Sequence, residues 1–168
     1  MACVAAEPLF VEGYRPGCIG RIVELHGSYY YRAWGVGAVF EMLMAQELCE
    51  FCEHYDAEHD LLLTASVGDR LIGSIAIQGS RDTTHTARLR WFIVEEGYHG
   101  RGIGRVLLER SLNFCRERGF HKVYLWTVDE LPRSRHLYEK VGFCVVEQGI
   151  DSRYGTTLLS LKMELNLQ

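Results

Sequence analysis

Val-Glu-Glu-Gly-Tyr-His-Gly-Arg-Gly-Ile-Gly-Arg-Val-Leu-Leu-Glu-Arg is the sequence of residues 94–110, in which closely spaced glycines join an apolar segment to an amphipathic one. The preceding residues, Leu89–Val94, are rich in β-branched and aromatic side chains, as is typical of a strand. Apolar residues from Ile103 to Phe114 recur at helical spacing and predict a helix that ends near Gly119. We therefore expect a strand, a tight turn and a helix in that order.

The glycines of this turn suggest a binding site for an anion. Gly100, Gly102 and Gly104 remove side chains where backbone N–H groups would face a ligand. A helix that begins near Ile103 would direct its unpaired N–H groups and the positive end of its dipole at the same point. The turn therefore predicts a phosphate site; the alternative is a surface turn whose glycines serve only its geometry.

Two common phosphate-binding designs do not fit the spacing. A P-loop requires Gly-x-x-x-x-Gly-Lys-Ser/Thr, but the pair Gly97 and Gly102 is followed by Ile103 and Gly104. The dinucleotide fingerprint requires Gly-x-Gly-x-x-Gly, but Arg105 stands where the third glycine should fall. Neither a P-loop nor a dinucleotide site is expected here.

Two motifs resemble those of the Gcn5-related N-acetyltransferases (GNAT). His99–Gly104 resembles motif A, Arg/Gln-x-x-Gly-x-Gly/Ala, which in that family holds the pyrophosphate of coenzyme A. Ser134–Phe143 resembles motif B, Ala-x-x-Leu-Tyr-Glu-Lys-x-Gly-Phe, and fits it at six positions from Leu137 onward. The resemblance is strong over about Leu61 to Leu165.

The N-terminal part, from Tyr14 to Gly35, resembles the acetyltransferase portion of MarR–GNAT fusion proteins. No MarR-type winged-helix regulator accompanies it in this sequence, so DNA binding is not expected. The formal net charge of −4 also argues against nonspecific nucleic-acid binding as the main activity.

The resemblance implies a single N-acetyltransferase domain over residues 1–168, of the α/β (α+β) class. Its sheet would be mixed, mostly antiparallel and flanked by helices, with a splay between the strands near 88–94 and 122–128 that admits the pantetheine arm. From the residue pattern we also expect a strand over Leu9–Arg15, a helix interrupted at Gly27, a helix over about Val36–His54, a hairpin of 61–67 and 71–77, and closing strands near 143–148 and 157–165.

The expected ligand is acetyl-CoA, as a co-substrate and without a metal. By resemblance its contacts come from main-chain groups of the strand, from the glycine turn and from two arginines of that turn, namely Phe92, Ile93, Val94, His99, Gly100, Arg101, Gly102, Ile103, Gly104 and Arg105. An N–H group near Phe92 would donate to the thioester oxygen as negative charge develops there. Tyr138 aligns with the tyrosine that protonates the departing thiolate; the alternative is a packed helix tyrosine.

The resemblance implies direct transfer of acetyl from acetyl-CoA to a primary amine, of a small molecule, in a ternary complex. The alternative is a catalytically silent acyl-CoA-binding or regulatory module. Two departures from the family pattern bear on this choice: Leu131 replaces a cofactor-contacting asparagine, and His99 replaces Arg or Gln. Both would weaken acetyl-CoA binding or admit another acyl group.

The general base is not evident, because Arg88 and Arg90 stand where several relatives place a glutamate or histidine, and a guanidinium does not accept a proton at neutral pH. Weak candidates elsewhere are His85, Glu41, Glu95 and Glu96. Arg88 and Arg90 share one face of a strand, so they would read a carboxylate on the acceptor or else lie in solvent.

Size and composition set the remaining expectations. At 168 residues and 48% hydrophobic, the chain suits one domain with a substantial core. It has neither an export signal nor an apolar run of about 18 residues, so we expect a cytoplasmic protein without membrane contact. Cys49 and Cys52 are expected to be structural thiols.

The aromatic run Tyr29–Trp34 would line the acceptor pocket or pack on the sheet. A homodimer is one open outcome.

Overall fold

Alternating apolar stretches of the chain form one seven-stranded sheet in the computed structural model, which describes residues 7–167. The strand order is β1-β2-β3-β4-β5-β7-β6. The strands are β1 (Leu9–Glu12), β2 (Asp60–Val67), β3 (Arg70–Gly79), β4 (Thr86–Val94), β5 (Lys122–Val128), β6 (Cys144–Asp151) and β7 (Leu158–Asn166). The helices are α1 (Cys18–Trp34), α2 (Ala38–Glu53), the 3₁₀ turn η1 (Glu96–Tyr98), α3 (Ile103–Glu117) and α4 (Pro132–Lys140).

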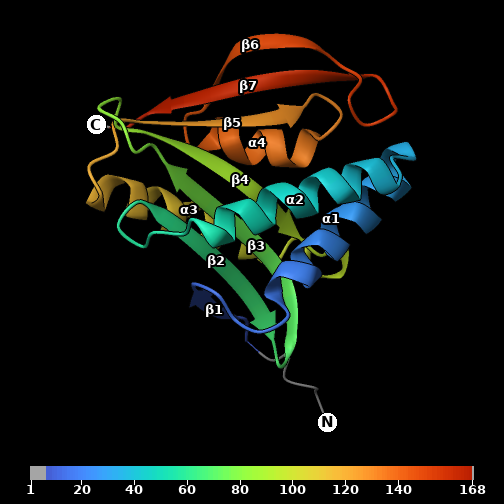
Figure 1. Ribbon diagram of the computed structural model, residues 1–168, viewed down its shortest axis with the longest axis horizontal. Helices are drawn as coiled ribbons and strands as arrows, with labels where there is room; N and C mark the ends of the chain where they lie inside the picture. Colours follow the sequence, from blue (N-terminus) through green and yellow to red (C-terminus); the bar gives the residue numbers. More distant parts are fainter. Residues whose placement is uncertain (1–6, 168) are drawn as a thin grey trace.

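The sheet opens between its two central strands. All neighbouring strands are antiparallel except β4 and β5, which are parallel and pair only at Thr86 with Lys122, Ala87 with Val123 and Arg88 with Tyr124. Beyond these three pairs the two strands diverge, as Figure 1 shows. The predicted mixed, mostly antiparallel sheet with a splay between residues 88–94 and 122–128 is therefore confirmed.

Helices cover both faces of the sheet because its inner strands are apolar on both sides. Within β2, Leu61 and Leu63 pack in the cluster that contains Leu107 of α3, whereas Leu62 packs in the cluster of α1 and α2 that contains Leu48. Figure 1 shows α1 and α2 crossing one face of the sheet, with α3 behind it and α4 beside β5. The splay therefore lies between helical layers on both sides.

The prediction that Gly27 interrupts the first helix is wrong, because α1 continues through it to Trp34. Gly27 is buried, and a Cβ there would lie 2.8 Å from Glu41 Oε2 on α2. The glycine therefore marks a close approach of two helices rather than a break. The aromatic run forms the last turns of α1, which ends at Gly35 in the left-handed conformation (φ 68°). The second helix agrees with its predicted range within two residues, whereas β1 ends at Glu12 instead of Arg15.

A β-bulge deforms β4 where it enters the splay. Ser74 pairs with Ile93 and Ala76 pairs with Arg90, so Trp91 and Phe92 together face a single residue of β3. Trp91 has a φ of 46°, which is rare for a bulky side chain. The Ser74 hydroxyl donates to the Trp91 carbonyl at 2.7 Å and holds this conformation in place. Strained backbone of this kind concentrates at functional sites.

Candidate active site

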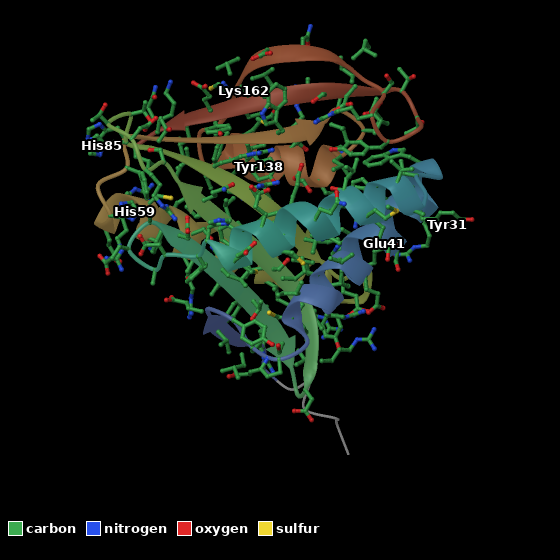
Figure 2. The ribbon with its side chains drawn as sticks, viewed as in Figure 1. Tyr31, Glu41, His59, His85, Tyr138 and Lys162 are labelled. Atoms are coloured by element: carbon green, nitrogen blue, oxygen red, sulfur yellow. The ribbon has the colours of Figure 1, made fainter. Side chains whose placement is uncertain are left out.

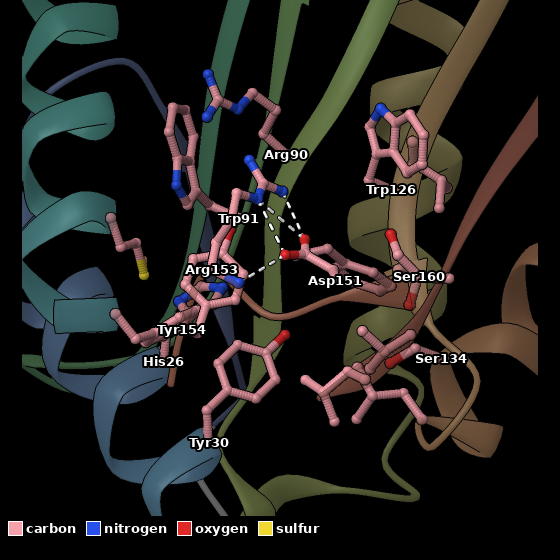
Figure 3. Close-up of a pocket in the computed structure, with 18 of the residues that line it drawn as sticks. His26, Tyr30, Arg90, Trp91, Trp126, Ser134, Asp151, Arg153, Tyr154 and Ser160 are labelled. Atoms are coloured by element: carbon pink, nitrogen blue, oxygen red, sulfur yellow. Dashed lines mark hydrogen bonds and ion pairs between the residues drawn. The ribbon is translucent and has the colours of Figure 1, made fainter. Parts of the chain in front are cut away.

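A cavity of about 780 Å³ occupies the opening between β4 and β5. Figure 3 shows its walls, which come from α1 and α2 on one side and from β5, α4 and the β6–β7 turn on the other. The aromatic and charged residues lining it are His26, Tyr30, Trp34, Phe40, Glu47, Arg88, Arg90, Trp91, Phe92, Tyr124, Trp126, Tyr138, Glu147, Asp151, Arg153 and Tyr154. The lining combines aromatic side chains with several charged groups, and polar groups that converge on a cavity of this size are typical of a small-molecule site.

The glycine turn presents unpaired N–H groups beside α3. Gly100 and Gly102 have φ values of 77° and 78°, a conformation that favours glycine. Within residues 7–167, no backbone carbonyl accepts a hydrogen bond from the N–H groups of Gly100 to Ile103. A Cβ added at Gly100 or Gly102 would meet no atom within 4 Å, so open space lies before this turn. The geometry of an anion cradle is therefore present.

The arginines of the turn lie at its surface. Arg101 stacks over the ring of Tyr98 at 4.9 Å, and Arg105 makes a long ion pair of 3.8 Å with Glu109. Exposed contacts of this kind contribute little to stability, about 0 to 1 kcal/mol. Both guanidinium groups can therefore rearrange toward a bound anion at low cost.

His99 links the turn to its two neighbours. Its Nε2 lies 2.7 Å from the Val94 carbonyl oxygen and its Nδ1 lies 3.0 Å from Arg133 Nη1. Because a carbonyl and a guanidinium have fixed roles, Nε2 donates to Val94 and Nδ1 accepts from Arg133. Both ring nitrogens are engaged, so the ring joins the end of β4 to the start of α4.

The end of β4 exposes one edge to the cavity. From Leu89 to Val94 this edge has no strand partner, because pairing with β5 stops at Arg88. Phe92 lines the cavity, Ile93 packs toward α1 and α2, and Val94 packs toward α3. Backbone N–H and C=O groups of this edge are the polar groups that an extended ligand could meet.

Tyr138 projects from α4 into the same opening. Its ring lies 5.8 Å from that of Phe92 and 5.7 Å from that of Phe143, measured between centroids, and only 5% of the residue is exposed. Burial, and secondly the neighbouring Tyr30, raise the pKa of Tyr138 well above its ordinary value, so the hydroxyl stays protonated at neutral pH. Within residues 7–167 the hydroxyl makes no hydrogen bond, and it is not among the fully buried polar atoms that lack a partner, so its proton is available to a ligand in the cavity. Leu131 and Ser134 line the cavity beside it.

The two arginines of β4 both line the cavity but differ in their contacts. Arg90 donates to Glu47 on α2 and, at 3.1 Å, to Gln78 on β3, and it stacks over the Trp91 ring at 4.1 Å. The Nε of Arg88 is buried and lacks a hydrogen-bond partner within the described part of the chain. The charge of Arg90 is therefore balanced inside the protein, whereas Arg88 retains an unused donor.

None of the four base candidates named from the sequence lines the cavity. Glu95 accepts from Arg70 and pairs with Arg21 at 3.2 Å, and Glu96 pairs with Arg32 at 3.0 Å. His85 stacks on the ring of His121 at 5.0 Å, and Figure 2 shows it at the end of the sheet, away from Tyr138. Glu41 packs against Gly27 between α1 and α2.

Several cavity residues were not singled out from the sequence as site residues. Tyr124 and Tyr154 come from segments with no recognisable motif, and Arg153 pairs with Asp151, two residues earlier at the end of β6, at 2.6 Å. His26 could have been noticed in the sequence, because it is a polar residue among the regularly spaced apolar residues of α1. In the structure it is 4% exposed. Of the aromatic run, Tyr30 and Trp34 line the cavity, whereas Tyr31 is exposed.

Within residues 7–167, no group of three or more histidine, cysteine or acidic side chains is placed to hold a metal ion. In the same part of the chain, no helix is both long enough and apolar enough to cross a membrane. Cys49 is exposed, whereas Cys52 is half-buried and burial raises the pKa of its thiol to about 11.

Comparisons with known proteins agree with this geometry. The chain is 42% identical over 62 residues to a mycothiol acetyltransferase of Beutenbergia cavernae, a match that covers 37% of this chain and 20% of that protein. Its fold is similar to that of an acetyltransferase of the GNAT family from Staphylococcus aureus, with a TM-score of 0.78, 19% identity, and coverage of 96% and 100% of the two chains.

A Salmonella typhimurium protein, solved with its cofactor acetyl-CoA, has a TM-score of 0.70 to this chain at 18% identity, with coverage of 97% and 95%. The chain spans about half or less of the length of the curated relatives it matches. The model of the Acetyltransferase (GNAT) family matches residues 19–143, most of the sequence. The chain therefore belongs to the acetyltransferase (GNAT) family.

Proposed function

We propose that this chain is an acetyl-CoA-dependent N-acetyltransferase, acting as a single domain over residues 1–168. It transfers an acetyl group directly to a primary amine of a small molecule while both substrates are bound. The observation that carries this proposal is the position of Tyr138, whose unpaired hydroxyl shares the cavity at the splay with the free edge of β4.

Acetyl-CoA binds along the glycine turn and the splay. The turn from His99 to Arg105 holds the pyrophosphate, chiefly through the unpaired N–H groups of Gly100 to Ile103, and Arg101 and Arg105 add positive charge. The open space before Gly100 and Gly102 supports this assignment, because a phosphate needs unobstructed approach to the backbone. Main-chain groups of Phe92, Ile93 and Val94 contact the pantetheine arm at the unpartnered edge of β4.

Two groups of the chain assist the transfer itself. As the amine attacks the thioester carbonyl, a backbone N–H near Phe92 donates to the oxygen that gains negative charge. The bulge at Trp91 supports this role, because it removes that part of β4 from regular pairing. When the carbon–sulfur bond breaks, Tyr138 gives its hydroxyl proton to the sulfur.

The acceptor carries a carboxylate near its amine. The unused Nε donor of buried Arg88 supports this, since an unpaired donor in a cavity is costly until a ligand satisfies it. Arg90 adds positive potential but is already bound to Glu47. An amino acid or another acidic metabolite, with an apolar portion against Tyr30 and Phe40, fits this lining.

Gly102→Ala is expected to weaken acetyl-CoA binding by about tenfold, because the methyl group occupies the space where phosphate approaches the N–H groups. The dissociation constant is measured by calorimetry at fixed salt. Gly119→Ala is the matched control: Gly119 has a φ of 73° and open space around its Cβ, but it follows the opposite end of α3. Both variants carry the same backbone strain. Equal affinity of the two variants for acetyl-CoA would refute the assignment of the glycine turn as the phosphate-binding site.

The substrate class is tested by thiol release from acetyl-CoA across paired acceptors, each α-amino acid beside its amide. Arg88→Gln is expected to raise KM for the acid at least about tenfold and to leave KM for the amide unchanged, because a charge-assisted hydrogen bond is worth about 1.5 to 3 kcal/mol. An equal loss on both would show that Arg88 does not read a carboxylate. Binding of acetyl-CoA without turnover on any amine would instead identify a silent acyl-CoA-binding module.

A further inference from the structure

His26 is the one histidine that lines the cavity within residues 7–167. It lies on α1, on the wall of the cavity that faces β4, and Figure 3 shows it beside Tyr30 and Tyr154. Its ring centroid is 6.0 Å from that of Tyr30. Tyr30 in turn lies near enough to Tyr138 to contribute to the raised pKa of that hydroxyl. His26, Tyr30 and Tyr138 therefore border one continuous space.

The contacts of His26 determine which ring nitrogen carries the proton. Nδ1 lies 2.9 Å from the Ile22 carbonyl oxygen, one turn earlier in α1. A carbonyl only accepts hydrogen bonds, so Nδ1 is the protonated nitrogen and Nε2 carries a lone pair. A fixed tautomer with one bare nitrogen is the arrangement that a histidine base requires.

The Nε2 atom opens on the cavity rather than on packed protein. Within the described residues, the buried side-chain polar atoms that make no hydrogen bond are Arg88 Nε, Ser111 Oγ and Arg21 Nη2, the last of which forms an ion pair with Glu95. Nε2 of His26 has no hydrogen-bond partner and is not among them, and His26 lines the cavity. The lone pair of Nε2 is therefore accessible to a molecule bound there.

Burial leaves the imidazole of His26 neutral at pH 7. Burial lowers the pKa of His26 to about 4, against the opposing effect of the Ile22 carbonyl. Besides Tyr30 on the same helix, the titratable and charged residues that line the cavity from other elements are Glu47, Arg88, Arg90, Tyr124, Tyr138, Glu147, Asp151, Arg153 and Tyr154. Glu47 is paired with Arg90 and Asp151 with Arg153, so neither carboxylate is free to stabilise an imidazolium, and the third cavity carboxylate, Glu147, is exposed to solvent.

We propose that His26 is a further catalytic residue, whose Nε2 accepts the proton that the acceptor amine loses as it attacks acetyl-CoA. This inference rests on the proposed acetyltransferase function and adds its missing base. The nitrogen–carbon bond forms as the amine proton passes to Nε2. The carbon–sulfur bond then breaks, and the thiolate takes a proton from Tyr138. The His26 proton returns to the Tyr138 oxygen through solvent in the cavity, which restores both residues.

The test compares His26→Gln with wild type on the amine that wild type acetylates fastest among the paired acceptors. Glutamine keeps a hydrogen-bond acceptor but does not take up a proton, so kcat at pH 7 is expected to fall about 100-fold or more. The KM for acetyl-CoA is expected to stay within about twofold, because His26 does not border the glycine turn. The deficit should shrink at pH 9, where hydroxide is more abundant and can take up the proton that the attacking amine loses; a purely structural role would lower kcat equally at both pH values.

The matched control is His54→Gln. His54 makes the same contact at the end of α2, with Nδ1 2.9 Å from the Glu50 carbonyl oxygen, but it is exposed and outside the cavity. This variant should retain wild-type kcat. Full activity in His26→Gln would overturn the inference while leaving the proposed function intact, whereas absence of turnover in wild type would overturn the proposed function.

A spectroscopic measurement decides the same point without turnover. In a two-bond ¹H–¹⁵N spectrum of the wild-type protein at pH 7, His26 is expected to show a protonated Nδ1 and a bare Nε2. A protonated Nε2 would remove the lone pair and overturn the inference. Because this readout uses the wild-type protein, it tests the tautomer of His26 even if His26→Gln does not fold.

Discussion

Tyr138→Phe is expected to lower kcat for thiol release from acetyl-CoA by about 100-fold or more, the usual contribution of a positioned acid. The phenylalanine ring fills the same space between Phe92 and Phe143, so packing is retained. Only the hydroxyl is lost, and with it the proton that the sulfur needs as it departs.

The KM and the melting temperature of Tyr138→Phe should show whether the tyrosine acts in the reaction or only in packing. The KM for acetyl-CoA and the melting temperature are expected to change little, since the lost hydroxyl has no hydrogen-bond partner among the described residues. Tyr31→Phe removes a hydroxyl from the exposed side of α1 and serves as the control. An unchanged kcat in Tyr138→Phe would show that the tyrosine is only a packing residue.

A second large effect concerns stability in mild acid. The pKa of His26 is lowered from 6.5 to about 4 by burial, so the folded protein binds this proton more weakly than the unfolded chain does. Above pH 6.5 His26 is neutral in both states and does not destabilise the fold. As the pH falls from 6.5 toward 4, the unfolded chain takes up a proton that the folded protein does not, so the free energy of unfolding decreases. We expect the free energy of unfolding to decrease by about 2 kcal/mol between pH 7 and pH 5, from about 1.4 kcal/mol per pH unit below 6.5.

Carboxylates make their contribution in a lower range. Asp151, Glu95 and Glu164 have pKa values lowered chiefly by hydrogen bonds from arginine or lysine, so they lose stabilisation mainly below their ordinary values of 3.8 to 4.5. Urea unfolding at pH 7 and pH 5 therefore separates the histidine effect. His26→Gln should flatten the pH dependence and His54→Gln should preserve it; an identical slope in wild type and His26→Gln would contradict the prediction.

The sequence predicted the parts of this molecule that depend on neighbouring residues. The strand, glycine turn and helix from Leu89 onward were readable because periodicity, positive-φ glycines and helix geometry act over a few positions. The splay was expected through family resemblance, and the pairing of β4 with β5 confirms it. The roles assigned to Tyr138 and to the glycine turn remain predictions.

The parts that depend on distant residues could not be read in the same way. Arg90 and Glu47 are 43 positions apart, and their pairing follows only from how α2 crosses β4. Gly27 looked like a helix break because sequence does not show that Glu41 approaches it. The site of His26 likewise depends on where α1 lies over the opening, which its apolar stripe alone does not specify.

The three-residue pairing of β4 with β5 gives the sheet two internal edges in addition to its outer ones. Exposed strand edges commonly recruit other chains and promote aggregation. Here the internal edges face each other across a cavity of about 780 Å³ walled by helices, so a small extended molecule fits between them more readily than another polypeptide does. The unpaired edges of β4 and β5 are therefore shielded from pairing with a second chain, although their backbone groups remain open to a small ligand.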